Sequence, residues 1–304
     1  MTTSTEVRPK SRPGRMVPVA GSRTQRRPTR MIAVAGSRTL YHTVMIVLSL
    51  IYIVPLGWMV MSSFKSKREI FDSPFSPPAV PDFSTWAEAW ERGNLGGYVL
   101  NSVIVTALAV TIILLCALAA AYAFSRFEFR GKTLLLAPFI LGLLLPVQSY
   151  ITAQSRIFDS VYLLNTRWVL MVAYAGLGLS LAVFLLKAYL DSMPKEIFEA
   201  ARVDGAGDFR TLVQIVLPLM APGISTVAVF SILSAWNEFL LAMLYVQDDD
   251  LRTIPAGLLA FTGRHATDYP MLFAALSMIT LPVIVVYTIF HKQVIAGVTE
   301  GSVQ

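Results

Sequence analysis

Six long apolar segments, separated by short polar loops, constrain this chain more than any other feature of its sequence. A helix needs about 20 mostly apolar residues to cross the roughly 30 Å hydrocarbon core of a bilayer. Six segments meet that requirement: residues 41–64, 99–124, 134–153, 168–186, 219–246 and 271–290. Only 14% of the residues are charged, whereas soluble domains carry about 25%. We therefore predict an all-α polytopic membrane protein with six transmembrane helices.

The distribution of Lys and Arg predicts the orientation of these spans, because cytoplasmic loops carry an excess of basic residues. If the N-terminus is inside, 17 of the 25 Lys and Arg residues lie on cytoplasmic segments, nine of them within residues 1–40. The opposite loops carry acidic residues, including the run 248–250. We therefore expect both termini to be cytoplasmic.

The same features divide the chain into three parts. Residues 1–40 are rich in Arg, Ser, Thr and Pro, and we predict a disordered, basic cytoplasmic tail that contacts anionic membrane lipid. Residues 41–296 form the predicted transmembrane domain, and residues 297–304 form a short cytoplasmic tail. The net charge of +6 comes mostly from the first part. It therefore indicates a charged tail and no nucleic-acid-binding surface.

The predicted cytoplasmic loop 191–218 has a distinctive pattern of two short helices around a glycine break. Gly205 or Gly207 supplies the left-handed residue that ends the first helix, and Asp208 is the candidate N-cap of the second. The first helix is partly apolar, and its paired alanines permit close approach of another backbone. Such a surface suits docking into a groove of another protein. The alternative is an interfacial helix that lies flat on lipid.

This loop resembles the EAA coupling loop of ABC-importer permeases. The family pattern is Glu-Ala-Ala, three residues, Gly, nine residues, Ile, one residue, Leu-Pro, and the sequence matches it at every position. The residues that fill the pattern are Glu199, Ala200, Ala201, Gly205, Ile215, Leu217 and Pro218, and Asp204, next to Gly205, is assigned to the same motif. The resemblance implies the type I ABC importer permease fold and a loop that sits in a cleft of an ATPase subunit. Glu199 would pair there with a basic residue, and Gly205 would make the turn.

The likeness extends from the first span to the C-terminus and points to the carbohydrate branch of the family, the maltose-type second permease. Similar stretches are 100–102, 120–123, 127–132, 235–239 and 294–301. The resemblance implies import of a mono- or oligosaccharide across the bacterial cytoplasmic (inner) membrane. It implies as partners a second homologous permease, a dimer of ATPase subunits that binds ATP and Mg, and an extracytoplasmic solute-binding protein. Importers of glycerol phosphate or another polar solute share this type of permease and remain an alternative.

Nothing in the sequence predicts catalysis or a cofactor in this chain. Gly131-Lys132-Thr133 is similar to the end of a phosphate-binding P-loop, but Arg126 occupies the required earlier glycine position and a span precedes it in place of a strand. We therefore predict that a separate partner hydrolyses ATP. The three histidines are scattered along the chain, so no metal site is predicted.

Polar residues within or near the spans are candidates for a solute pathway or gate. They are Asn101, Gln148, Ser149, Tyr150, Asn237 and Glu238. A charge in hydrocarbon costs several kcal/mol, so Glu238 is expected to face protein, water or a partner; a hydrogen-bonded lock between helices is the alternative role. Asn101 can instead cap the second span, and residues 148–150 can hydrogen-bond neighbouring helices.

An ion-coupled secondary transporter is the rival from another class. It would need intramembrane carboxylates placed in an internal repeat, whereas this sequence has one such glutamate and no convincing repeat. A membrane scaffold or channel would not need the full coupling motif. The sequence therefore favours the importer permease.

Overall fold

The computed structural model describes residues 29–262 and 267–300, and these residues form helices joined by short loops, with no strand among them. The predicted all-α class is therefore confirmed. Residues 1–54 and 55–304 form two units, which are described separately.

The first unit contains the start of helix α1 (Thr29–Ser62). Side chains of residues 40–54 are all exposed, and most of them are large and apolar. A helix that is apolar all round suits a lipid environment. Because α1 begins at Thr29, residues 29–40 are helical and the predicted disordered tail is wrong over this stretch. An apolar run, residues 31–35, follows Pro28 there, and two of its five residues are alanine, the best helix former. The rest of the predicted tail, residues 1–28, lies outside the described residues.

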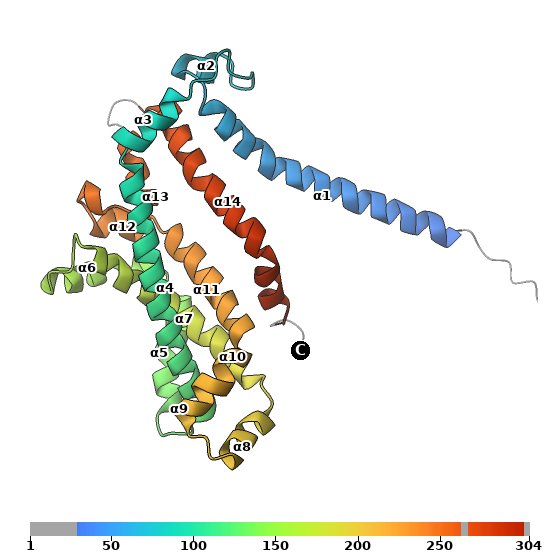
Figure 1. The fold of residues 1–304 in the computed structure, drawn as a ribbon, viewed down its shortest axis with the longest axis vertical. Helices are drawn as coiled ribbons and strands as arrows, with labels where there is room; N and C mark the ends of the chain where they lie inside the picture. The colour runs from blue at the N-terminus through green and yellow to red at the C-terminus, as the bar shows by residue number, and fades with distance from the viewer. Residues whose placement is uncertain (1–28, 263–266, 301–304) are drawn as a thin grey trace, which may run out of the picture. The chain divides into compact units, whose positions relative to one another are not determined.

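The second unit is built around the long helices α4, α7 and α11, which pack along one another (Figure 1). Helices α2 and α3 lie at one end of this unit, and α8 and α9 lie at the other. Helix α14 continues to Glu300, so the predicted C-terminal tail begins within it, and residues 301–304 lie outside the described part. The elements are α2 (Lys67–Asp72), α3 (Ser84–Arg92), α4 (Leu95–Arg126), α5 (Lys132–Leu144), η1 (Val147–Ser149), α6 (Ile151–Ser160), α7 (Arg167–Asp191), α8 (Lys195–Val203), α9 (Asp208–Thr211), η2 (Leu212–Val216), α10 (Leu217–Leu219), α11 (Ala221–Trp236), α12 (Leu240–Tyr245), η3 (Asp249–Leu251), α13 (Ile254–Gly257), η4 (Leu258–Phe261) and α14 (Tyr269–Glu300).

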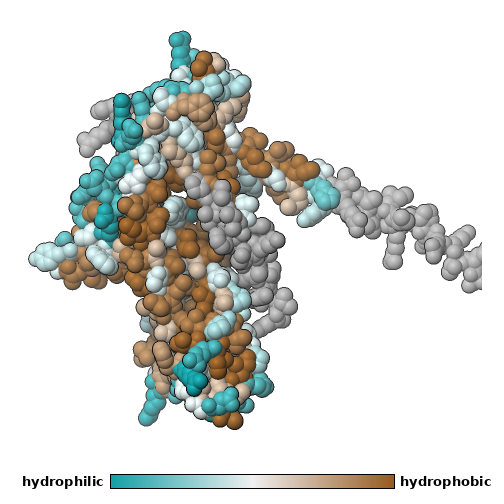
Figure 2. Space-filling model, viewed as in Figure 1, coloured by the Kyte–Doolittle hydropathy of each residue, from teal (hydrophilic) through white to brown (hydrophobic). Residues whose placement is uncertain are grey.

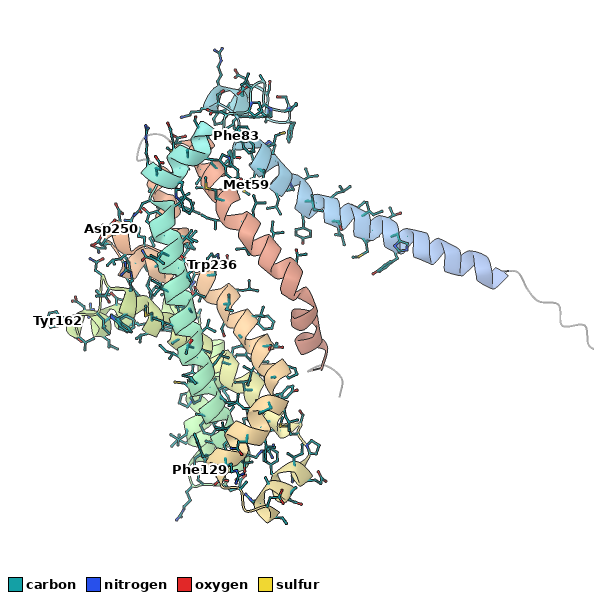
Figure 3. The ribbon with its side chains drawn as sticks, in the orientation of Figure 1. Met59, Phe83, Phe129, Tyr162, Trp236 and Asp250 are labelled. Atoms are coloured by element: carbon teal, nitrogen blue, oxygen red, sulfur yellow. The ribbon has the colours of Figure 1, made fainter. Side chains whose placement is uncertain are left out.

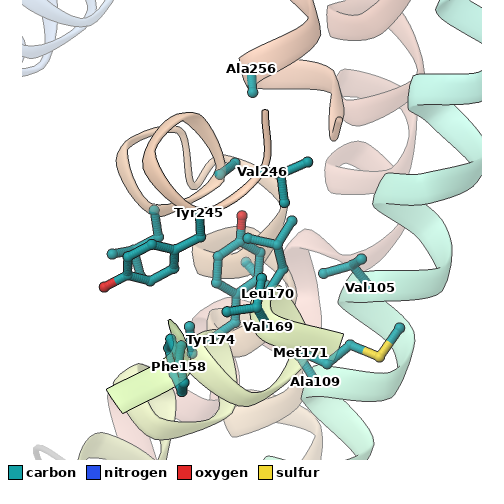
Figure 4. Close-up of a cluster of buried hydrophobic side chains, with 14 residues drawn as sticks. Val105, Ala109, Phe158, Val169, Leu170, Met171, Tyr174, Tyr245, Val246 and Ala256 are labelled. Atoms are coloured by element: carbon teal, nitrogen blue, oxygen red, sulfur yellow. The ribbon is translucent and has the colours of Figure 1, made fainter. Parts of the chain in front are cut away.

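Small residues allow α4 and α7 to approach closely. Ala109 and Ala117 on α4 and Ala173 and Ala182 on α7 are at most 1% exposed. Such residues are typical of helix contacts in membranes, where lipid is as apolar as the side chains and close packing drives association. Figure 4 shows one of the resulting clusters, in which side chains of α4, α6, α7 and α12 meet. Figure 2 shows hydrophobic atoms gathered along the middle of this unit.

Within the described residues, three helices are separately long and apolar enough to cross a membrane: Leu40–Ser62, Leu95–Arg126 and Arg167–Asp191. The pair Asp208–Leu219 and Ala221–Trp236 qualifies only as one span bent by 76°, and Lys132–Leu144 and Tyr269–Leu281 are shorter apolar helices. The six-span count therefore stays a prediction.

Two of the predicted spans are interrupted in the structure. Residues 134–153 break after Leu144, because Pro146 disfavours the helical conformation at the residue before it, and Leu145 has an extended backbone with ψ of 121°. Residues 219–246 break after Trp236, and a new helix, α12, begins at Leu240.

Candidate functional site: the coupling segment

Residues 191–218, here called the coupling segment, form two helical parts around a glycine break, as predicted. Gly205 has φ of +74°, in the left-handed region that favours glycine, and it follows directly on the end of α8. Gly207 has an extended backbone and is the N-cap of α9. The predicted capping role of Asp208 is therefore wrong: Asp208 is the first helical residue, where the helix dipole favours its negative charge.

The second helical part is not a simple α-helix. Its residues Leu212–Val216, including Ile215 of the motif, form the π-helical turn η2. Met220 is fully buried at the bend of 76° that leads into α11. Single π-helical turns are frequent at functional sites because they interrupt the regular hydrogen-bond ladder. The motif therefore includes a π-helical turn and ends directly before the bend.

The motif residues divide between two faces. Ala201 is 2% exposed and packs against the rest of the unit, and Ile215 and Leu217 are half-buried. The other motif residues are exposed: Glu199, Ala200, Asp204, Gly205 and Pro218. Two large apolar side chains of the same segment are also exposed, Val203 by 87% and Phe209 by 79%. An exposed face that carries both a carboxylate and large apolar side chains is typical of a protein-binding surface.

The last turns of α4 attach the coupling segment to the rest of the unit. The Tyr122 hydroxyl donates to the Asp208 carbonyl at 3.3 Å, and the Ser125 hydroxyl donates to the Asp191 carboxylate at 2.6 Å. Figure 3 places Phe129, which follows α4, at the same end of the unit as α8 and α9. Sequence reasoning missed these anchoring residues, although their position at the predicted cytoplasmic end of a span was a usable signal.

Arg126, the last residue of α4, makes two further contacts with this region. Its guanidinium donates a hydrogen bond to the Leu190 carbonyl, and the same group lies 3.4 Å from the centre of the Phe198 ring. The contact therefore joins α4, α7 and α8 at one point.

Asn101, a predicted pathway residue, is 2% exposed and forms a structural bracket. Its amide nitrogen donates to the carbonyls of Asp250 and Arg252 at 2.8 and 3.0 Å, and its amide oxygen accepts from Arg167 Nε at 2.8 Å. The neighbouring Ser102 hydroxyl accepts from the backbone of Ile254 at 2.8 Å. These bonds tie residues 247–257, here called the bracketed segment, to α4.

Glu238 is half-buried, and its carboxylate accepts from the backbone N–H groups of Leu241 and Ala242 at 3.0–3.2 Å. These are free donors at the start of α12, so Glu238 caps the helix that resumes after the break. Asn237 is exposed and donates to the Leu233 carbonyl in its own helix at 2.8 Å.

Among the predicted pathway residues, Glu238 lines a small cavity. A cavity of about 10 Å³, the size of a single water molecule, is lined by Glu238 together with Tyr174, Ser231 and Ser234. Residues 148–150 lie elsewhere, at the break between α5 and α6, where Gln148 and Ser149 are exposed and Tyr150 is half-buried. The polar groups Tyr174, Ser231 and Ser234 were missed because single hydroxyl residues in apolar runs carry no spacing signal.

Comparison with known proteins identifies the family. A family described as "Binding-protein-dependent transport system inner membrane component" matches residues 30–299. The chain is also 38% identical over 263 residues to the diacetylchitobiose uptake system permease protein NgcG of Streptomyces coelicolor, covering 86% of this chain and 87% of that protein. The chain belongs to this family of transport permeases.

Other relatives of this permease agree. It is 37% identical over 250 residues to the probable ABC transporter permease protein YurM of Bacillus subtilis, with 82% of this chain and 83% of that protein covered. It is 30% identical over 267 residues to the trehalose/maltose transport system permease protein MalG of Thermococcus litoralis, with 85% and 94% covered. The predicted resemblance to carbohydrate ABC-importer permeases is therefore confirmed, and the permease is a multi-pass inner-membrane protein.

A solved structure shows the same fold. It is the crystal structure of a bacterial ABC transporter involved in the import of the acidic polysaccharide alginate, whose matched chain has a TM-score of 0.73 and 19% sequence identity, with 91% of this permease and 99% of that chain covered. The predicted ABC-importer permease fold is thereby confirmed at the level of architecture.

Proposed function

We propose that this permease is one transmembrane subunit of an ATP-driven, binding-protein-dependent importer of a mono- or oligosaccharide. Relatives that cover more than four fifths of the chain are named for the uptake of diacetylchitobiose, of trehalose and maltose, and of melibiose, raffinose and stachyose. What these solutes share is a glycosidic carbohydrate. The proposal assigns that class to this chain and leaves the individual sugar open.

The observation that supports the coupling role is the difference in exposure between the two faces of the coupling segment. Its inner face holds the buried Ala201, whereas its outer face presents Glu199, Val203 and Phe209 to solvent. An ATPase subunit that receives this face would cover the apolar side chains and pair with the carboxylate. Closure of the ATPase dimer on ATP would then displace the segment and shift the spans between two arrangements, because ATP binds one arrangement better than the other.

The proposed assembly contains four kinds of subunit. This permease pairs with a second homologous permease in the membrane, an ATPase dimer binds the coupling segments, and an extracytoplasmic protein delivers the solute. ATP and Mg are bound and hydrolysed by the ATPase subunits. We further propose six spans with both termini cytoplasmic, an arrangement supported by the placement of α2–α3 and α8–α9 at opposite ends of the second unit.

Charge reversal at Glu199 tests the proposal in the assembled complex, reconstituted in vesicles with its binding protein. We expect Glu199→Arg to abolish ATP-dependent sugar uptake and to reduce the amount of ATPase that co-purifies. Asp159→Arg is the matched control, because it makes the same charge change at an exposed residue of α6 and should leave uptake near the wild-type level. Wild-type uptake by Glu199→Arg, or uptake by the unmodified complex without ATP, would overturn the proposal.

A further inference from the structure

The contact between Arg126 and Phe198 is the most specific link between the coupling segment and the spans. Leu190, whose carbonyl accepts from the guanidinium, lies in the last turn of α7, and the same carbonyl also accepts from the backbone N–H of Met193 at 3.3 Å. The face of the same guanidinium covers the Phe198 ring of α8, 3.4 Å from its centre. A planar guanidinium can stack and donate at the same time, whereas a lysine ammonium offers only a point charge. The geometry therefore specifies arginine.

Within the described residues, the contact leaves one donor of the Arg126 guanidinium unused. Arg126 is half-buried, and its Nε is shielded from solvent without a hydrogen-bond partner among the described residues. A buried donor that lacks a partner lowers the free energy of unfolding. Arg126 therefore contributes less to the stability of this end of α4 than a fully hydrogen-bonded arginine would.

Phe198 precedes Glu199 directly, and the two side chains differ in burial. Phe198 is half-buried and packs against the cluster that contains Leu186 and Leu190 of α7, whereas Glu199 is exposed. Phe198 is therefore one side chain through which displacement of α8 reaches the body of the permease, and its ring contacts Arg126 on α4.

We propose that Arg126 is a positioning residue that ties α8 to the end of α4, so that displacement of the coupling segment moves α4 together with α7. This inference rests on the proposed function of the coupling segment. It adds a specific route: the stacked Arg126–Phe198 pair carries the movement into α4, a helix of 32 residues. Tyr122 and Ser125, one turn or less away, hold the backbone and the carboxylate on either side of that route.

Measuring the amount of sugar imported per ATP hydrolysed tests this role in the complete reconstituted complex. We expect Arg126→Ala to assemble with the ATPase and to retain ATP hydrolysis, while sugar imported per ATP falls about tenfold, a change within the usual range for coupling between two sites. Arg126→Lys should recover part of the ratio, because it restores the charge but not the stacked plane. An unchanged ratio in Arg126→Ala would overturn the proposal.

Two more variants separate coupling from folding. Phe198→Leu removes the ring while leaving an apolar side chain and Arg126 itself, and it should lower the same ratio. Combining Phe198→Leu with Arg126→Ala should lower it no further than Arg126→Ala alone. Arg130→Ala, at an exposed arginine in the loop after α4, is the matched control and should couple normally. Loss of assembly in both Arg126→Ala and Phe198→Leu, or normal coupling in Phe198→Leu, would overturn the proposal.

The same measurements distinguish this inference from the proposed function. If the proposed function is wrong, the unmodified complex will show no ATP-dependent uptake and Glu199→Arg will have no effect. If only the inference is wrong, the unmodified complex will transport, Glu199→Arg will fail, and Arg126→Ala will transport with the wild-type ratio.

Discussion

The bracketed segment, 247–257, and the coupling segment, 191–218, are both polar connections between long helices, but they are held in opposite ways. Asn101 and Ser102, each 2% exposed, hydrogen-bond directly to the backbone of the bracketed segment. The coupling segment is attached by side chains at the end of α4 and leaves Val203 and Phe209 exposed. The bracketed segment finds its hydrogen-bond partners within the chain, whereas the coupling segment leaves an exposed surface for a partner.

This difference has a physical reason. A backbone carbonyl or N–H group that is buried without a partner destabilises the fold, so buried amide and hydroxyl groups fix the bracketed segment in one conformation. Exposed apolar side chains cost the isolated chain little and become favourable only when another protein covers them. Substitutions in the first segment should therefore change the stability of the permease, and substitutions on the exposed face of the second should change assembly.

The largest expected effect on stability follows from Asn101→Leu. This change removes hydrogen bonds to Asp250, Arg252 and Arg167, and we expect it to lower the free energy of unfolding by about 2–4 kcal/mol, since each net hydrogen bond contributes about 1 kcal/mol. The thermal midpoint of the purified complex measures the loss. Asn237→Leu is the matched control, because Asn237 is exposed and bonds only within its own helix. Equal midpoints for the two variants would contradict the bracket.

A smaller effect separates two buried serines. Ser102→Ala leaves the buried N–H of Ile254 without its hydrogen-bond acceptor. It should therefore lower the free energy of unfolding by about 1–3 kcal/mol. Ser277 is fully buried, and its hydroxyl has no hydrogen-bond partner among the described residues. Ser277→Ala should therefore leave the thermal midpoint unchanged or raise it. The comparison fails if both alanine variants lose stability to the same extent.

Glu238 caps α12, the short helix that precedes the bracketed segment. Substitutions at Glu238 should therefore change the stability of the permease according to how many acceptor oxygens they retain. Loss of the carboxylate in Glu238→Ala is expected to cost about 1 kcal/mol, the usual value for a helix N-cap. Glu238→Gln keeps one acceptor oxygen and should retain much of that stability. The second measurement is the rate of sugar uptake at increasing sugar concentration. A raised KM for the sugar in Glu238→Gln, with an unchanged thermal midpoint, would assign Glu238 to the solute pathway and not to the cap.

Sequence patterns predicted what depends on local chemistry. The apolar runs predicted the long helices, and the motif spacing predicted the two-part coupling segment with Gly205 at its turn. The break at residues 145–146 follows from Pro146, whereas the break at residues 237–239 was harder to predict, because a helix break inside an apolar run depends on what satisfies the freed backbone groups. Glu238 does so at the second break, and nothing in its sequence context distinguished a cap from a pathway residue.

Contacts between distant segments were beyond sequence reasoning for a related reason. Asn101 was predicted as a cap of its own span or as a pathway residue. Its hydrogen-bond partners are instead residues 250 and 252, which are distant in sequence and lie close to it only in the folded chain. Arg126 was read only as a cytoplasmic charge and as an argument against a P-loop. Its stacking on Phe198 requires α4 and α8 to meet, and no periodicity within either helix contains that information.

The smallest expected effect on stability comes from substitutions on the exposed face of the coupling segment. Val203→Ser and Phe209→Ser replace side chains that are 87% and 79% exposed, so each should change the free energy of unfolding by less than about 0.5 kcal/mol, as is usual for surface positions. Both should nevertheless weaken binding of the ATPase, because the apolar area that the ATPase would cover is lost. Co-purification and thermal midpoints measure the two quantities.

Phe75→Ser is the matched control for these variants. Phe75 is 82% exposed but lies in the loop between α2 and α3, at the other end of the second unit from α8. Its replacement should alter neither stability nor ATPase binding. If Val203→Ser and Phe209→Ser retain full ATPase binding, the exposed apolar face of the coupling segment is not the contact surface. A fall in thermal midpoint as large as that of Asn101→Leu would instead show that both segments are held by the fold in the same way.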